Sequence, residues 1–455
     1  MANRNTAHHD NDEYNKITKF LSSLSILAAL TAVFAYVWFG INANDIDIMP
    51  FDTKGHYLII TLYFVLQYIL SRVYGALKIG LYKVWDIVYS QVLTTFIVDV
   101  VMYAVISLTA RKLVDVLPVL EMFGLQIVLI VLWAFTSTII YRWIYPPRKL
   151  VVVYADSQAT NLVRKLSVRD DKFLICEAVK LDDGIEKIKQ RIDIYDGVII
   201  CDVPGSDRND ILKYCYDHNK RTYVTPKISD ILIRSGENVH LLDTPLLLCR
   251  NNGLTFEQRF FKRILDIVVS LIGLVVMAIP MLITAIAIKL CDHGSVFFLQ
   301  DRVTKDGKVF KIIKFRSMYE NADADRGGKA HSATKDDDRI TPVGKVIRAC
   351  RMDEFPQIFN ILKGDMSVVG PRPECIENVE AYTSDIPEFA YRNKVKAGLT
   401  GYAQIYGKYN TTAYDKLKLD LYYIQNYSIR TDIRLILMTV KVLFMKESTE
   451  GFDET

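Results

Sequence analysis

Long uncharged runs near the start of the chain constrain its fold more than any other feature. A transmembrane helix needs about 20 consecutive apolar residues. Four runs before Tyr145 approach or exceed that length: residues 20–43, 57–71, 87–110 and 122–141. Tryptophan and tyrosine side chains lie near the ends of these runs, as is typical of the membrane–water interface. The sequence therefore predicts a four-helix transmembrane bundle over residues 1–147.

Loop charges predict how this bundle lies in a membrane. Basic residues precede the first run and occupy the second loop, whereas the first loop is acidic. Because cytoplasmic loops carry an excess of lysine and arginine, we expect both ends of the bundle on the cytoplasmic face. The third loop, with Arg111 and Lys112, fits this pattern least. Asp99 interrupts the third run. It is either a functional intramembrane acid or a polar side chain packed between helices. The second interpretation is favoured, because no other intramembrane charge accompanies Asp99.

The overall composition excludes several classes of protein. Of the 455 residues, 51% are hydrophobic and 24% are charged, which excludes a disordered chain and a small disulfide scaffold. A net charge of +4 is too small to indicate nucleic-acid binding. The seven cysteines all follow the fourth run, are odd in number and form no CxxC motif. We therefore expect reduced cytosolic thiols rather than disulfides or a zinc site.

Residues 148–252 alternate between strand-like and helix-like segments, which predicts a small α/β, Rossmann-like domain. The strands are expected at 150–154, 173–179 and 197–201, and the helices at 158–166, 185–191 and 210–218. The turn after the first strand contains no glycine, whereas a dinucleotide-binding loop needs glycines to approach a pyrophosphate. A scaffold or dimerisation role is favoured over cofactor binding, and a homodimer is expected.

A fifth apolar run covers residues 264–288 and has basic residues on both sides. A spanning helix would place one basic flank outside, which the positive-inside rule disfavours. Pro280 lies in the middle of the run and removes a backbone hydrogen bond there. We predict a re-entrant membrane helix that breaks at Pro280, with a kinked spanning helix as the alternative.

Residues 253–455 are predicted to form a mainly α-helical catalytic domain that contains this fifth run. Strands at 296–299 and 309–315 form a β-hairpin through a turn at 305–307. Residues 321–338 are polar and charged, which favours a mobile loop or lid. An amphipathic basic helix from residue 432 to 446 is expected to lie on the membrane surface or to pack against the domain.

An acidic pair, Asp353 and Glu354, stands just before a short amphipathic helix that Gly364 ends. Pro356 is tolerated only in the first turn of a helix, which places Asp353 at or near the N-cap. The free N–H groups there favour anions, so Asp353 can stay ionised beside a phosphate and act as a nucleophile in phosphoryl transfer. The alternative is that Asp353 only caps the helix.

Cations around this pair favour the phosphate interpretation. Arg372 stands between two prolines on a stiff turn, a setting suited to bidentate phosphate contact. The other cations assigned to substrate phosphate are Arg302, Lys314, Arg316 and Arg351.

A further acid, Asp420, lies on the same face of a predicted helix as Leu417 and Ile424. An inward carboxylate needs a cation. The candidates are an arginine partner or a magnesium ion shared with Asp353 or Glu354, because magnesium takes one or two carboxylates together with phosphate oxygens.

Several motifs in this last region resemble the bacterial sugar transferase family, the monotopic polyprenyl-phosphate phosphoglycosyl transferases. They read KRILD at 262–266, KFRSM at 314–318, DEFPQ at 353–357, LKGDMSVVGPRP at 362–373 and GLTGYAQ at 398–404. The resemblance covers about residues 256–444, and the segments before it look like the large branch of the family. A serine–proline pair commonly breaks the membrane helix in relatives; here the pair is Ile279–Pro280.

The resemblance implies a reaction and a set of roles. Sugar-1-phosphate would pass from a UDP-sugar to undecaprenyl phosphate at a bacterial inner membrane, releasing UMP and priming capsule, exopolysaccharide or O-antigen synthesis. Asp353 would carry the phosphosugar, Glu354 would assist in proton transfer or metal support, Arg372 would bind phosphate, and Mg²⁺ would be held by Asp353 and Asp420. The alternatives are a membrane-tethered UDP-sugar dehydratase and a non-enzymatic scaffold of a polysaccharide complex.

Overall fold

The fold was obtained as a computed structural model of the full chain. It describes residues 3–40, 53–155, 158–167, 169–249, 253–320, 337–407 and 411–443. The predicted loop or lid at 321–338 lies almost entirely outside the described residues. The chain divides into two compact units, residues 1–226 and 227–455, and each is described by itself.

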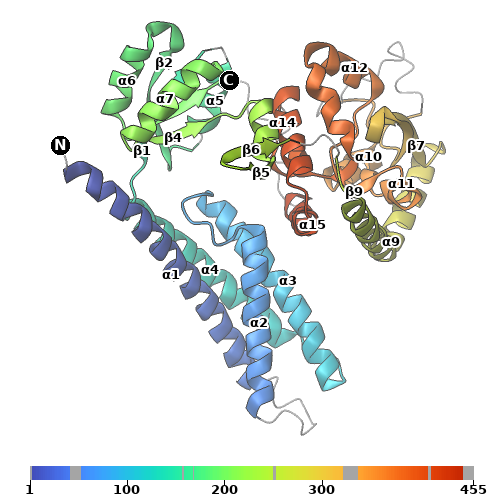
Figure 1. Cartoon of the computed structure of the whole chain (residues 1–455). Helices are drawn as coiled ribbons and strands as arrows, with labels where there is room; N and C mark the ends of the chain where they lie inside the picture. Colours follow the sequence, from blue (N-terminus) through green and yellow to red (C-terminus); the bar gives the residue numbers. More distant parts are fainter. Residues whose placement is uncertain are drawn as a thin grey trace. The chain divides into compact units, whose positions relative to one another are not determined.

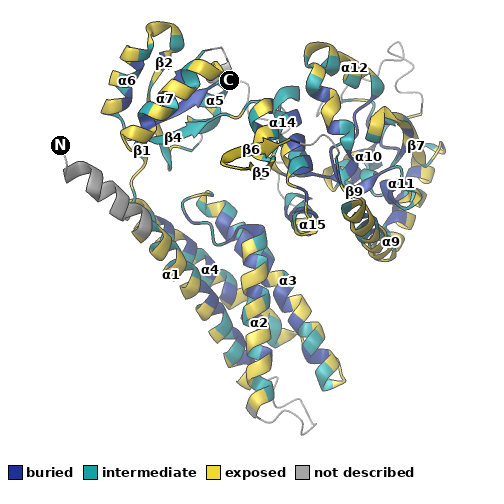
Figure 2. Ribbon diagram, viewed as in Figure 1, coloured by how far each residue is buried: buried dark blue, intermediate teal, exposed yellow. Residues whose placement is uncertain are grey.

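The first unit begins with four long helices that share one hydrophobic core. They are α1 (Asn3–Gly40), α2 (Thr53–Tyr74), α3 (Val84–Ala110) and α4 (Leu117–Ile144) (Figure 1). All four contain a segment that is long and apolar enough to cross a membrane. Exposed residues, drawn yellow in Figure 2, recur along these helices. Many of them are large apolar residues, such as Leu58, Leu108 and Ile139. The protein is therefore a membrane protein, as the uncharged runs predicted.

A buried polar seam joins α2 to α3. Gln67 Nε2 donates to Thr95 Oγ1 over 2.9 Å, and one turn further along Ser71 Oγ donates to Gln91 Oε1 over 3.3 Å. Hydrogen bonds of this kind hold transmembrane helices together where no hydrophobic force acts between them. Asp99 is buried one helical turn beyond Thr95, so it is packed inside the bundle.

The rest of the first unit is an α/β domain with a four-stranded parallel sheet in the order β2-β1-β3-β4. Apolar side chains of α5 cover one face of the sheet, and those of α6 and α7 cover the other. The predicted alternation of strands and helices is present. The elements are β1 (Arg148–Tyr154), α5 (Gln158–Ser167), β2 (Phe173–Lys180), α6 (Ile185–Ile194), β3 (Gly197–Cys201), α7 (Gly205–Asp217) and β4 (Arg221–Val224).

The second unit starts earlier than the predicted boundary at residue 253. Helix α8 (Ile228–Arg234) belongs to it, because Ile228 and Ile231 pack with Phe389, Leu417 and Leu421 in one cluster. A helix of seven residues is too short for its apolar pattern to mark a domain boundary in the sequence. The antiparallel hairpin of β5 (Glu237–Leu241) and β6 (Thr244–Leu248) follows and was not predicted.

Helix α9 (Phe256–Asp292) contains the fifth apolar run and is the fifth segment able to cross a membrane by length and composition. The expected break at Pro280 is absent, because the helix continues through Pro280 to Asp292. A proline removes only one backbone N–H, so a helix can bend there without ending. Thr284 Oγ1 donates to the Pro280 carbonyl over 2.8 Å, a contact typical of bent helices.

A mainly helical domain surrounds the base of α9. The antiparallel hairpin of β7 (Phe297–Val303) and β8 (Val309–Phe315) confirms the predicted pair of strands, and its turn places Asp306 and Gly307 at φ 58° and 74°. The remaining elements are α10 (Pro342–Ala349), α11 (Gln357–Lys363), β9 (Ser367–Val369), α12 (Ile376–Asp385), β10 (Gly398–Thr400), α13 (Tyr402–Tyr406), α14 (Ala413–Gln425) and α15 (Ile429–Leu443).

Candidate active site

The acidic pair lies in a 3₁₀ turn, Met352–Glu354, that follows Arg351 in the left-handed region at φ 54°. Helix α11 starts only at Gln357, with Pro356 as its N-cap residue, and ends at Gly364 with φ 99°. The end at Gly364 was predicted correctly, but the N-cap position of Asp353 was wrong. Pro356 has helical dihedral angles but occupies the N-cap position, and the helix proper begins at the next residue. The acidic pair therefore lies about one turn before the helix.

Glu354 is held by two cations from different elements. Arg372 Nη2 approaches its Oε1 to 2.7 Å, and Lys314 Nζ of β8 approaches the same oxygen to 3.4 Å. Burial works against the charged carboxylate, but the charges of Arg372 and Lys314 outweigh it and hold the pKa of Glu354 well below its usual range. Glu354 is therefore ionised across the physiological pH range.

Asp353 has a different environment from its neighbour. Within the described residues its carboxylate has no hydrogen bond or ion pair. Burial and the adjacent charge of Glu354 raise the pKa of Asp353, against the opposing charges of Lys314, Arg348 and Arg372. An acidic pair whose two pKa values are moved in opposite directions is typical of active sites. Asp353 is thus the carboxylate of the pair whose oxygens have no hydrogen-bond or ion-pair partner among the described residues.

The other predicted phosphate-binding residues fall into two groups. Arg302 donates to the Pro373 carbonyl over 3.2 Å, beside the Arg372 turn. The charge of Arg351 lowers the pKa of Glu354. Arg302, Lys314, Arg351 and Arg372 thus surround the acidic pair. Arg316 does not, because it pairs with Asp292 at the end of α9 and with Glu320.

Asp420 is paired with an arginine, which was one of the two cations considered for it from the sequence. Arg392 Nη2 lies 2.8 Å from Asp420 Oδ2, and both side chains are buried. Asp420 shares the buried face of α14 with Leu417 and Ile424, as predicted. Burial raises the pKa of Asp420, although Arg392 opposes the shift.

Sequence reasoning missed Arg392 and the buried cluster around it. Its guanidinium also donates to the Arg372 carbonyl over 2.9 Å and lies 3.6 Å from Glu374, which Lys416 approaches to 3.0 Å. Arg392 thus connects Asp420 to the backbone of the turn that carries Arg372. No local pattern in residues 387–394 marks it, since its partners lie far away in the sequence.

The donor set fits a magnesium ion at one carboxylate only. Within the described ranges no three histidine, cysteine, aspartate or glutamate side chains gather as a metal-binding group. Magnesium uses few protein carboxylates and completes its shell with phosphate oxygens and water, so the open carboxylate of Asp353 suits it. Asp420 suits it less, because Arg392 already supplies a cation there and binds Oδ2 through two nitrogens. The predicted pairing of Asp353 with Asp420 as metal ligands is thus not supported by the position of Asp420.

The comparisons with known proteins match the region of the chain that contains this site. The family model described as bacterial sugar transferase matches residues 257–446. A UDP-glucose:undecaprenyl-phosphate glucose-1-phosphate transferase of Caulobacter vibrioides is 38% identical over 192 residues, which cover 41% of this chain and 71% of that protein. The chain therefore belongs to the bacterial sugar transferase family.

Two further relatives place the similarity in the same region. A UDP-N-acetylgalactosamine-undecaprenyl-phosphate N-acetylgalactosaminephosphotransferase of Aeromonas hydrophila is 43% identical over 187 residues, 40% of this chain. A UDP-glucose:undecaprenyl-phosphate glucose-1-phosphate transferase of Klebsiella pneumoniae is 42% identical over 217 residues, 46% of this chain. The chain spans 44% of the length of each of these two relatives. Their names differ in the sugar, so the similarity does not identify one.

Proposed function

We propose that the protein transfers sugar-1-phosphate from a UDP-sugar to undecaprenyl phosphate and releases UMP. The observation that carries this proposal is the pair of unequal carboxylates, in which Arg372 and Lys314 hold Glu354 while Asp353 is left open. The names of the relatives, which act on UDP-sugars and undecaprenyl phosphate, support the same reaction. The middle segment supports the dehydratase alternative less, because its first turn has no glycine.

The chemistry proceeds in two displacements at one phosphorus atom. An Asp353 oxygen attacks the β-phosphorus, the new O–P bond forms, and the bond to the bridging oxygen breaks, so UMP leaves with that electron pair. A phosphate oxygen of undecaprenyl phosphate then attacks the same phosphorus and frees the Asp353 carboxylate. Arg372 and Lys314 offset the negative charge of both substrates. A magnesium ion at Asp353 would neutralise further charge on the diphosphate.

A panel of UDP-sugars tests the substrate directly. Purified full-length protein in detergent, with undecaprenyl phosphate and Mg²⁺, is expected to release UMP with one or a few of UDP-glucose, UDP-galactose and their N-acetylated forms. Release of UMP that also requires the lipid acceptor in stoichiometric amount supports transfer rather than hydrolysis. Failure with every sugar, at enzyme concentrations that would reveal a single turnover, contradicts the proposal.

The pH dependence of kcat/KM should reflect the opposite pKa shifts of Asp353 and Glu354. Only ionised Asp353 attacks, and its pKa is raised, so activity is lost as the pH falls through a range above that of an ordinary aspartate. Glu354→Gln removes a neighbouring negative charge and frees Lys314 and Arg372 to act on Asp353. Both effects lower the pKa of Asp353. The acidic limb of the profile, in which activity falls with falling pH, should therefore move to lower pH. A limb that stays in place or moves upward would show that a different group titrates.

Membrane insertion of α9 can be tested with two native cysteines. Cys249 precedes the helix, Cys291 lies at its end, and both are exposed. If α9 re-enters and leaves on the cytoplasmic face, an impermeant maleimide should label neither one in intact cells and both after permeabilisation. Each is tested as the sole cysteine of the chain. Labelling of one from outside would show that α9 spans the membrane.

A further inference from the structure

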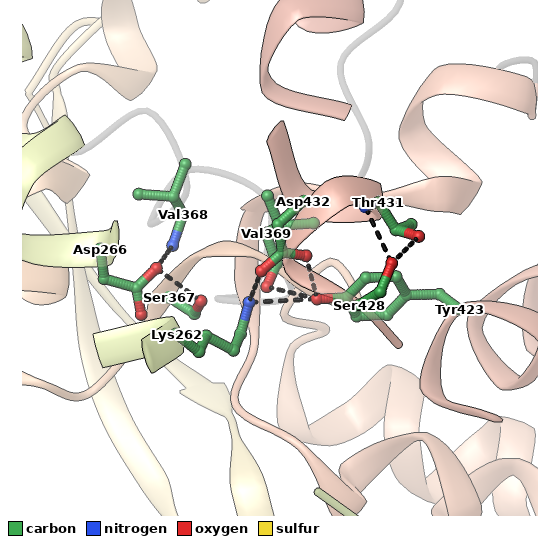
Figure 3. A network of polar contacts seen from close by, with 9 residues as sticks. All are labelled: Lys262, Asp266, Ser367, Val368, Val369, Tyr423, Ser428, Thr431 and Asp432. Carbon is green, nitrogen blue, oxygen red and sulfur yellow. Dashed lines mark hydrogen bonds and ion pairs between the residues drawn. The ribbon is translucent and has the colours of Figure 1, made fainter. Parts of the chain in front are cut away.

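The first turns of α9 carry three charged side chains that bind the folded domain rather than solvent or lipid. Lys262 Nζ lies 2.7 Å from Asp432 Oδ2 and donates to the Tyr423 hydroxyl over 3.0 Å (Figure 3). Lys262 and Asp432 are both buried. A buried pair needs such close geometry to offset desolvation. The base of the apolar helix is therefore fixed to α14 and α15.

Asp266, one turn further along α9, binds strand β9. Its Oδ1 accepts two hydrogen bonds of 2.8 Å, from the Ser367 hydroxyl and from the Val368 backbone N–H (Figure 3). The Tyr423 hydroxyl accepts from Lys262 and donates its single proton to Asp432 Oδ1 over 2.7 Å, while its oxygen lies 3.3 Å from the Val369 carbonyl oxygen. Two of the three residues of the short strand β9, Ser367 and Val368, are thus held directly from α9.

Strand β9 leads straight into the turn that presents Arg372. Gly370 N donates to the Thr400 carbonyl, and Gly398 N donates to the Pro371 carbonyl, each over 2.8 Å. A Cβ atom at Gly370 would lie 2.4 Å from the Lys396 carbonyl oxygen, so only glycine fits there. The turn has little freedom of its own, and a displacement of β9 would move Arg372 with it.

Arg263 makes the corresponding connection to the acidic pair. Its two terminal nitrogens donate to the carbonyls of Ile361 and Leu362, each over 2.6 Å. These are C-terminal carbonyls of α11, which a cation is suited to bind. Helix α11 begins three residues after Glu354. One helix therefore holds both segments that carry the ion pair of Glu354 and Arg372.

We propose that Arg263 and Asp266 are positioning residues, through which the apolar helix α9 sets the distance between the acidic turn and the Arg372 turn. This inference rests on the proposed function. Neither side chain needs to touch a substrate. Because an error of about 1 Å in the placement of reacting groups can cost about 100-fold in rate, the bond from Asp266 to β9 should govern kcat.

The decisive variants are Asp266→Ala and Asp266→Asn in the full-length protein. Alanine removes both acceptor bonds, so kcat for UMP release should fall about 100-fold with a smaller change in KM. Asparagine keeps a side-chain oxygen that can accept both bonds, and it should restore most of kcat. If the alanine variant does not fold, Arg263→Lys is the milder test, since lysine can hold only one of the two carbonyls well.

The kcat of the folded protein separates positioning from general destabilisation. In Asp266→Ala kcat per folded molecule should fall while the folded fraction stays measurable, and Asp266→Asn should restore it. Leu254→Ala is the control, because it removes a side chain from the same hydrophobic core without removing a bond to β9. It should lower the amount of folded protein and leave kcat per folded molecule unchanged.

Each result has one meaning. A normal kcat in Asp266→Ala, or an equal loss of kcat per folded molecule in Leu254→Ala, would overturn the positioning role. Asparagine as damaging as alanine would overturn it too, because the bonds would then not be what matters. If the wild-type protein itself releases no UMP, the proposed function fails instead, and the variants are not the cause.

Discussion

Asp353→Asn is expected to abolish UMP release from a UDP-sugar in the presence of undecaprenyl phosphate, with a loss of at least about 1,000-fold, as is usual when a nucleophile is removed. The amide is nearly the same size as the carboxylate but cannot form the O–P bond. In the wild-type protein the Asp353 carboxylate makes no hydrogen bond or ion pair within the described residues, so its replacement by an amide of the same size should change stability little. Unchanged unfolding temperature and lost activity are expected together.

Trapping the intermediate is the direct form of this test. With acceptor lipid withheld, wild-type protein should gain the mass of one phosphosugar on the peptide that contains Asp353, and Asp353→Asn should not. Glu354→Gln is the matched control, because it alters the neighbouring carboxylate and leaves the proposed nucleophile in place. Substantial turnover in Asp353→Asn would disprove its assignment as the nucleophile. Normal turnover with no adduct in the wild-type protein would favour direct transfer between the two substrates.

The second large effect is expected on stability. Arg392→Met leaves Asp420 buried without its cation, and breaking a buried ion pair in this way costs about 3–5 kcal/mol. The Arg392 and Asp420 side chains are only 3% and 1% exposed, so water cannot replace the lost contact. The thermal unfolding midpoint of the full-length protein in detergent should fall markedly.

The double variant Arg392→Met/Asp420→Leu is the control for this prediction. It removes both charges, and an apolar pair of similar volume can be as stable as a buried ion pair. The midpoint should therefore recover most of its loss. The magnesium concentration that gives half-maximal UMP release should stay the same as in the wild-type protein, because Asp420 is occupied by Arg392 and not by the metal. A large increase would return Asp420 to the metal site.

Sequence patterns predicted the local elements well where one physical signal dominated. Uncharged runs of about 20 residues have one stable outcome in a bilayer, and all five became long helices. The hairpin of β7 and β8 and the glycine end of α11 also followed from local chemistry. The N-cap assignment of Asp353 failed because a proline can stand either inside a helix or at its N-cap, and local pattern does not separate these positions.

The partners of charged residues were harder to predict. Asp420 was recognised as an inward carboxylate, but Arg392 could not be found, because the two are joined only by tertiary folding. Arg316 was grouped with Lys314 because both lie at the end of one predicted strand. Arg316 pairs with Asp292 at the end of α9, whereas Lys314 pairs with Glu354. Residues two apart along a strand lie on the same face, so strand alternation does not distinguish Lys314 from Arg316. Only the contacts separated them.

The ion pairs of Glu354 have a consequence for how substrate would enter. Before a diphosphate arrives, the carboxylate stands in for it by holding Lys314 and Arg372 in place. Two long side chains are thereby ordered in advance, so binding loses less conformational freedom. The same arrangement cancels part of the positive field that would draw an anion inward. The site without substrate therefore has ordered cations but a weaker long-range attraction for anions. Its affinity for substrate should depend less on salt concentration than that of a cluster of unpaired cations.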